Sequence, residues 1–168
     1  MAITGSGHVY RDWVANYIKH NFGSRGVEIY SEVSAGKSII GKNRSIDLLV
    51  LDVQNNNALA IECKFQEVGG TADEKIVYAL KDAESMQMFK YVVYGGIGWS
   101  TGIKHMLEAH ELACFAEPLD LDPNDFNRYG APRKRNGVAP RESTIELDHI
   151  LAMRFGWWDL LVAGKTPY

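Results

Sequence analysis

The chain has 168 residues and 46% hydrophobic residues, a length and composition that suit one ordinary globular domain. Its formal net charge of −3 argues against a large nonspecific surface for nucleic acid, because phosphate binding relies on Lys and Arg, but it permits a local basic groove. No apolar run is long enough to span a membrane and the first residues lack a secretory pattern, so we expect a cytoplasmic protein without a membrane partner.

The elements that we expect follow from the spacing of apolar residues. Repeats every three or four positions predict helices, whereas alternation, or a short apolar run between polar or glycine-rich segments, predicts a strand. In chain order these patterns predict a helix over 8–22, strands over 27–34, 45–53 and 58–65, a helix over 72–89, a strand over 91–94, a helix over 103–111, a strand over 113–116 and a helix over 144–153. The order predicts an α/β fold with a mixed sheet flanked by helices.

Two helix starts carry the capping-box spacing, in which Ser or Thr precedes Glu by three residues. These are Thr71 with Glu74 and Ser143 with Glu146. We expect residues 1–117 to form the core and residues 118–168 to be an extension of the same domain. The extension would contain a basic loop, a helix and a last segment that is either a strand or a packing arm.

The strand over 58–65 carries two charged residues in an otherwise apolar run. Alternation places Glu62 and Lys64 on one face, while Leu59, Ile61 and Cys63 share the other. A charge buried without a partner is costly, so a central strand of this kind calls for neighbouring charges.

The polar segment between the second and third strands predicts a hairpin turn in which Val53 pairs with Ala58. In that register Asp47 faces Lys64 and lies diagonal to Glu62, roughly 7–8 Å away at the backbone. A slip by one residue would move the two carboxylates to opposite faces, so the arrangement depends on the turn.

Two carboxylates at this reach can share a hard divalent cation such as Mg²⁺ or Mn²⁺. Such a cation polarises a phosphoryl oxygen and lowers the pKa of a bound water, and Lys64 would orient that water or stabilise the developing charge. The alternative is that Glu62 and Lys64 form a solvated face or a surface ion pair, or belong to a hydrolase of another class.

The motif Ser45-Ile46-Asp47, followed by Glu62-Cys63-Lys64, resembles the PD-(D/E)XK nuclease superfamily. The αβββαβ core of that restriction-endonuclease-like fold corresponds to residues 8–94 here. Ile46 replaces the proline of the motif, a position at which the family often departs from proline.

The resemblance implies a metal-dependent site on the hairpin. It assigns metal binding to Asp47 and Glu62 and positioning of the nucleophilic water to Lys64. It also suggests Glu32 as an earlier acidic ligand, with Glu28 in reserve, and matches Gln66 to a glutamine that some members place after the lysine. The implied catalytic residues are Asp47, Glu62, Lys64, Glu32 and Gln66, and the implied metal ligands are Asp47, Glu62 and Glu32.

By this resemblance we expect a Mg²⁺-dependent DNA endonuclease of the restriction, phage or homing type, in which Mn²⁺ can replace Mg²⁺. A homodimer is expected because cutting a duplex needs two active sites. The alternative is a catalytically inactive DNA-binding or assembly module with the same fold. Basic residues that could contact DNA phosphates, if they are not simply solvated, are Lys75, Lys104, Arg133, Lys134 and Arg135.

Overall fold

The computed structural model describes residues 6–66, 69–70, 72–96, 98–117 and 144–168. Its elements lie close to the expected positions along the chain. In order they are α1 (Ser6–Phe22), the 3₁₀ helix η1 (Gly23–Arg25), β1 (Val27–Lys37), β2 (Asn43–Asp52), β3 (Asn57–Phe65), α2 (Ala72–Ser85), β4 (Lys90–Gly95), α3 (Thr101–Ala109), β5 (Ala113–Phe115), α4 (Ile145–Phe155) and α5 (Trp158–Leu161).

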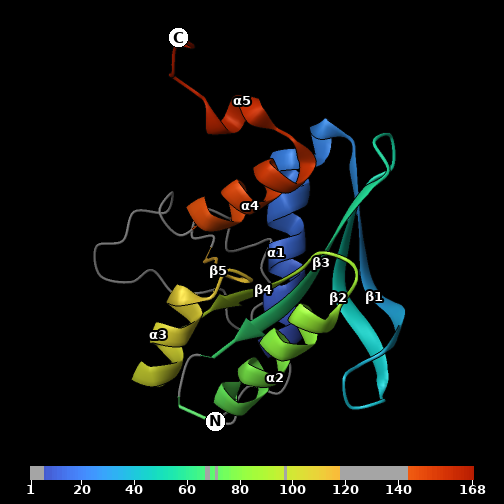
Figure 1. The fold of residues 1–168 in the computed structure, drawn as a ribbon, viewed down its shortest axis with the longest axis vertical. Coiled ribbons are helices and arrows are strands. Elements are labelled where there is room, and N and C mark those ends of the chain that lie inside the picture. Colours follow the sequence, from blue (N-terminus) through green and yellow to red (C-terminus); the bar gives the residue numbers. More distant parts are fainter. Residues whose placement is uncertain (1–5, 67–68, 71, 97, 118–143) are drawn as a thin grey trace.

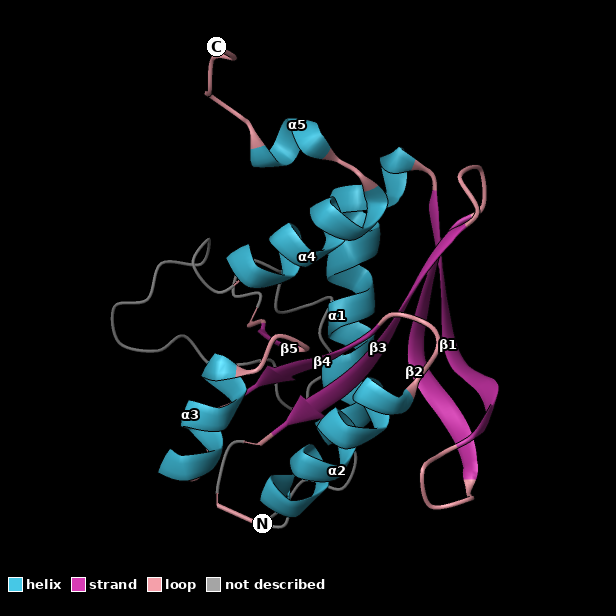
Figure 2. Ribbon diagram, viewed as in Figure 1, coloured by secondary structure: helices cyan, strands magenta, loops and turns pink. Residues whose placement is uncertain are grey.

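The strands form one five-stranded sheet in the order β1-β2-β3-β4-β5. The pairs β1–β2 and β2–β3 are antiparallel, whereas β4 runs parallel to β3 and β5 parallel to β4 (Figure 2). Helices flank this mixed sheet, so the expected restriction-endonuclease-like α/β fold is confirmed.

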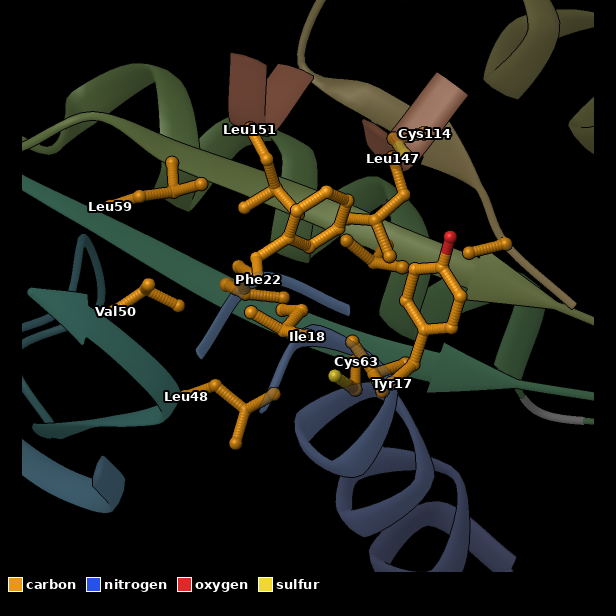
Figure 3. Close-up of a cluster of buried hydrophobic side chains, with 14 of the residues drawn as sticks. Tyr17, Ile18, Phe22, Leu48, Val50, Leu59, Cys63, Cys114, Leu147 and Leu151 are labelled. Carbon is orange, nitrogen blue, oxygen red and sulfur yellow. The ribbon is translucent and has the colours of Figure 1, made fainter. Parts of the chain in front are cut away.

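Each face of the sheet has its own apolar cluster. On one face α1 and α4 pack against β2 and β3. Figure 3 shows helix side chains, such as Ile18, Phe22 and Leu151, gathered with the strand side chains Leu48, Val50 and Leu59. On the other face α2 and α3 pack against β4, with Ile76, Leu80 and Leu107 buried (Figure 1). On α2 the side chains of Ile76, Leu80 and Ala83 are buried.

The predicted register of the hairpin is wrong by two positions. Asp52 pairs with Asn57, and Leu51 rather than Val53 pairs with Ala58. The Asp52 carboxylate accepts hydrogen bonds from the backbone N–H of Asn55 at 3.2 Å and from its side-chain amide at 2.6 Å. These bonds pull the turn forward to 53–56, and apolar Val53 is left 60% exposed outside the strand.

Three further boundaries differ from expectation. The strand β1 continues to Lys37 and pairs there with Asn43, so the expected loop over 35–44 shrinks to 38–42. The helix α2 ends at Ser85, four residues before the expected Phe89. The last segment forms the short helix α5 rather than a strand.

Thr71 and Ser143, the first residues of the two expected capping boxes, lie outside the described residues. Among the described helices, none is long and apolar enough to cross a membrane.

Candidate active site

The side chain of Asp47 lies where the pairing of β2 with β3 gives way. The ladder runs up to Leu48 and Ile61. Beyond it, the Cys63 N–H donates to the Asp47 Oδ2 atom at 2.8 Å, in place of a backbone carbonyl. The backbone of one strand therefore fixes the carboxylate of the other.

The carboxylate of Glu62 lies between two ammonium groups. Its Oε1 atom accepts a hydrogen bond from Lys64. Its Oε2 atom lies 3.3 Å from the Nζ atom of Lys90, the first residue of β4. The two lysines differ in solvent exposure: the side chain of Lys64 is 22% exposed, and that of Lys90 only 3%.

Lys90 is anchored from the other side by α2. Its Nζ atom donates to the Asp82 Oδ2 atom at 3.2 Å. Asp82 also accepts from the Arg44 guanidinium of β2, at 2.8 and 3.1 Å. A chain of ion pairs thus runs from β2 through α2 and β4 to Glu62 on β3.

The carboxylates of Asp47 and Glu62 are close enough for the charge of one to affect the pKa of the other. Burial, and then the neighbouring charge of Glu62, raise the pKa of Asp47, although the Cys63 N–H partly opposes this. Burial alone would lower the pKa of Lys64, but Glu62 and then Asp47 outweigh it, so the net pKa is raised. A cation beside Asp47 and Glu62 would relieve their repulsion.

The donor set at this position fits a hard divalent cation. Mg²⁺ is usually held by one or two protein carboxylates and completes its shell with waters and substrate phosphates. Asp47 and Glu62 supply such a pair. Over the described ranges no group of three or more His, Cys, Asp or Glu side chains is placed to hold a metal ion, so in this conformation these residues offer a pair of carboxylates.

Glu32 lies opposite Asp47 in the register of β1 and β2, between the Ser31–Leu48 and Val33–Ile46 pairs. Its φ of 54° is in the left-handed region, which is uncommon for a residue with a side chain. Its carboxylate accepts a 3.0 Å hydrogen bond from Arg11 of α1. In this structure Glu32 is thus engaged with α1, and a contact with a bound metal stays a prediction; Glu28, its reserve, bonds Tyr30 instead.

The side chain of Gln66 is buried and holds two segments together. Its Nε2 atom donates to the carbonyl of Gly98 at 2.8 Å, and its Oε1 atom accepts from the N–H of Ala72, the first residue of α2. Gly96 packs so closely on the Gln66 backbone that a Cβ at position 96 would lie 2.1 Å from its carbonyl oxygen. A catalytic role for Gln66 stays a prediction, whereas its contacts are structural.

The candidate phosphate contacts lie on separate elements. Lys75 is exposed on α2, and Lys104 is exposed on α3. Arg133, Lys134 and Arg135 lie outside the described residues.

Sequence reasoning missed Lys90, Asp82 and Arg44. One signal was present: Asp82 lies between Ala79 and Ala83 on the buried side of α2, where a lone carboxylate calls for a partner. A pocket of about 270 Å³ opens beside this network. Its lining includes Glu62, Lys90, Arg44, Tyr78, Ile40 and Lys42.

Two comparisons with known proteins found a match. The profile of the PD-(D/E)XK nuclease superfamily domain matches residues 6–158. A solved structure, a repair endonuclease from Pyrococcus abyssi, matches with 18% identity and a TM-score of 0.35 over 60% of this chain, which spans 43% of that chain. Among curated proteins, no relative matches.

Proposed function

The chain belongs to the PD-(D/E)XK nuclease superfamily, and from this premise we propose that it is a Mg²⁺-dependent DNA endonuclease that also accepts Mn²⁺. The observation that carries the proposal is the meeting of Asp47, in the middle of β2, with Glu62 and Lys64 near the end of β3. The family defines the class of protein, and this cluster supports the chemistry.

Asp47 and Glu62 would hold the cation through their carboxylate oxygens, with Asp47 already oriented by the Cys63 N–H. When bound, the cation would polarise the phosphodiester and make a coordinated water a stronger nucleophile. Glu32 is the candidate third ligand, and it would have to exchange its bond with Arg11 for one with the cation.

Lys64 is suited to act on the reacting groups because it is the more accessible of the two lysines on Glu62. Its raised pKa keeps it protonated at neutral pH, as a group that stabilises negative charge must be. Its ammonium would donate to the attacking water or to the phosphoryl oxygen on which charge develops.

A plasmid-nicking assay tests the proposal. Wild-type protein is expected to convert supercoiled DNA to nicked or linear forms with Mg²⁺ or Mn²⁺, and to stop when EDTA is added. Lys64→Ala should lose roughly 100-fold or more of this activity. Lys81→Ala, which removes an exposed lysine of α2, is the matched control and should cleave like wild type.

A protein that binds DNA without any metal-dependent cleavage would contradict the proposal and favour the inactive binding or assembly module. Two-strand cleavage is expected from a homodimer, because each strand needs its own active site. Sedimentation of the protein with and without a DNA duplex would check the homodimer, and a monomer under both conditions would exclude it.

A further inference from the structure

The loop between β1 and β2 is a short, well-defined hairpin tip, which we call the Ser38–Lys42 tip. The N–H of Ser38 donates to the carbonyl of Lys42 at 2.8 Å and closes it. Gly41 has a φ of 74°, which allows the chain to reverse. The Ile39 N–H donates to the Asp82 Oδ1 atom at 3.3 Å, so the tip is tied to α2 and to the ion-pair network.

Two large apolar side chains stand side by side at this tip and are open to solvent. Ile39 is 47% exposed and Ile40 is 58% exposed. Isoleucine is a residue that is most often buried, so an adjacent exposed pair indicates a contact that the described residues of this chain do not complete.

The charge around the tip favours a polyanion as its partner. From residue 33 to residue 46 the sequence contains three cationic residues, Lys37, Lys42 and Arg44, and no Asp or Glu. Arg44 is paired with Asp82 of α2, so Lys37 and Lys42 are the exposed cations that flank the two isoleucines. An apolar pair between cations is the pattern of proteins that bind phosphates with Lys or Arg and insert aliphatic side chains between bases.

The tip is also continuous with the candidate active site. Ile40 and Lys42 line the same pocket of about 270 Å³ as Glu62 and Lys90. A DNA strand with its scissile phosphate beside Glu62 would therefore pass the tip within a short distance. A partner protein that docked on the tip would not need to contact the candidate active site as well, whereas a DNA substrate must.

We infer that the Ser38–Lys42 tip is a DNA-binding wedge, in which Ile39 and Ile40 insert against the bases next to the scissile phosphate and Lys42 contacts a flanking phosphate. This inference rests on the proposed function for the identity of the substrate, and it deepens that function by assigning a second contact. Distortion of the DNA at the cleavage position is its direct consequence.

The test uses the full chain, with EDTA present so that binding is separated from cleavage. Binding to a DNA duplex is measured by fluorescence anisotropy, and unstacking is measured with 2-aminopurine placed at successive positions. The Ile39→Ser/Ile40→Ser double variant is expected to bind about tenfold more weakly and to lose the 2-aminopurine signal.

Val53→Ser is the matched control. Val53 is an apolar residue, 60% exposed, in the turn between β2 and β3, at the end of β2 away from the Ser38–Lys42 tip. It should bind like wild type. Lys42→Ala should lower the slope of log affinity against log salt by about one, without abolishing the 2-aminopurine signal.

Equal affinity and equal 2-aminopurine signal in wild type and a folded double variant would overturn the inference. So would a double variant that changes only the self-association of the protein, because the tip would then be an interface between copies. If the double variant does not fold, Ile40→Ser alone carries the same test. If the double variant binds DNA more weakly as expected but the wild type never cleaves DNA, the proposed function is contradicted and the wedge stays supported. If the wild type does not bind DNA, both the proposed function and the wedge are contradicted.

Discussion

The two faces of the central sheet are built from the same strands but have opposite characters. Towards α1 and α4, β3 presents Ile61 and Cys63 to a continuous apolar core. Towards α2 it presents Glu62 and Lys64, which take part in a network of ion pairs. Strand alternation alone separates the two roles, so that stability and chemistry are assigned to neighbouring residues of one segment.

The comparison teaches that the α2 face combines an apolar cluster with charges held by partners of opposite charge, whereas β3 contributes only apolar side chains to the α1 face. Lys90 and Asp82 are almost fully buried, yet both have more than one partner of opposite charge. Variants should therefore differ in how strongly they change cleavage and how strongly they change stability.

Asp47→Asn should give the largest effect and the clearest separation. Cleavage is expected to fall roughly 100-fold or more, because a metal ligand is lost. The free energy of unfolding at neutral pH is expected to rise, because the raised pKa of Asp47 means that its ionised form is disfavoured in the folded protein. Thermal melts beside the nicking assay would check this, and a lower melting temperature would contradict the assignment.

Lys90→Met should affect both properties. Removing one member of a buried ion pair leaves a charge without compensation. Because Glu62 keeps Lys64 and Asp82 keeps Arg44, we expect a loss of about 2 kcal/mol in unfolding free energy, below the roughly 3–5 kcal/mol of a fully orphaned charge. Urea denaturation measures it, and a variant as stable as wild type would show that the network contributes little.

A matched pair of core variants compares the two faces directly. Ile18→Val changes a residue of α1 and Ile76→Val a residue of α2, and both isoleucine side chains are fully buried between their helix and the sheet. Each should cost about 1 kcal/mol of unfolding free energy. Ile76→Val alone should also reduce cleavage per folded molecule, because α2 carries Asp82; equal activity in the pair would break the comparison.

The smallest effect concerns pH. Burial raises the pKa of Asp82, but hydrogen bonds from Arg44 and Lys90 outweigh it and hold the pKa below its usual value. A lowered folded-state pKa stabilises the protein above about pH 4, and this contribution is lost as the pH falls through the folded-state pKa. Asp82→Asn should therefore lose less stability than wild type on acidification from about pH 6 to about pH 3.

On the face covered by α1 and α4, Asp148 of α4 has a pKa shifted in the opposite direction to that of Asp82. Burial raises its pKa, although a hydrogen bond from Tyr17 partly offsets this. Protonation on acidification therefore favours the folded state, and Asp148→Asn should lose more stability than wild type over the same range. The same sign for Asp82→Asn and Asp148→Asn in urea titrations would contradict this contrast.

Local patterns predicted most of the fold because each element carries its own periodicity. The pairing of Asp47 with the Glu62 face was predictable even though the register was wrong, since a shift of two positions preserves the face. The error came from Val53, whose apolar side chain suggests a strand, whereas Asp52 and Asn55 form a turn through side-chain bonds.

The rest of the site depends on contacts between distant segments. Nothing local to Lys90 indicates that it will meet both Asp82 and Glu62, because the parallel β3–β4 pairing brings them together. The bond of Glu32 with Arg11 likewise depends on how α1 crosses the sheet and on an unusual backbone conformation.

The middle residue of the Glu62-Cys63-Lys64 tripeptide makes two separable contributions. Its N–H orients Asp47, and every amino acid except proline can supply that donor. Its side chain faces the core, where only size and apolarity are required. We therefore expect that Val or Ala can replace the thiol with the hairpin geometry intact, whereas Pro would remove the donor that orients Asp47.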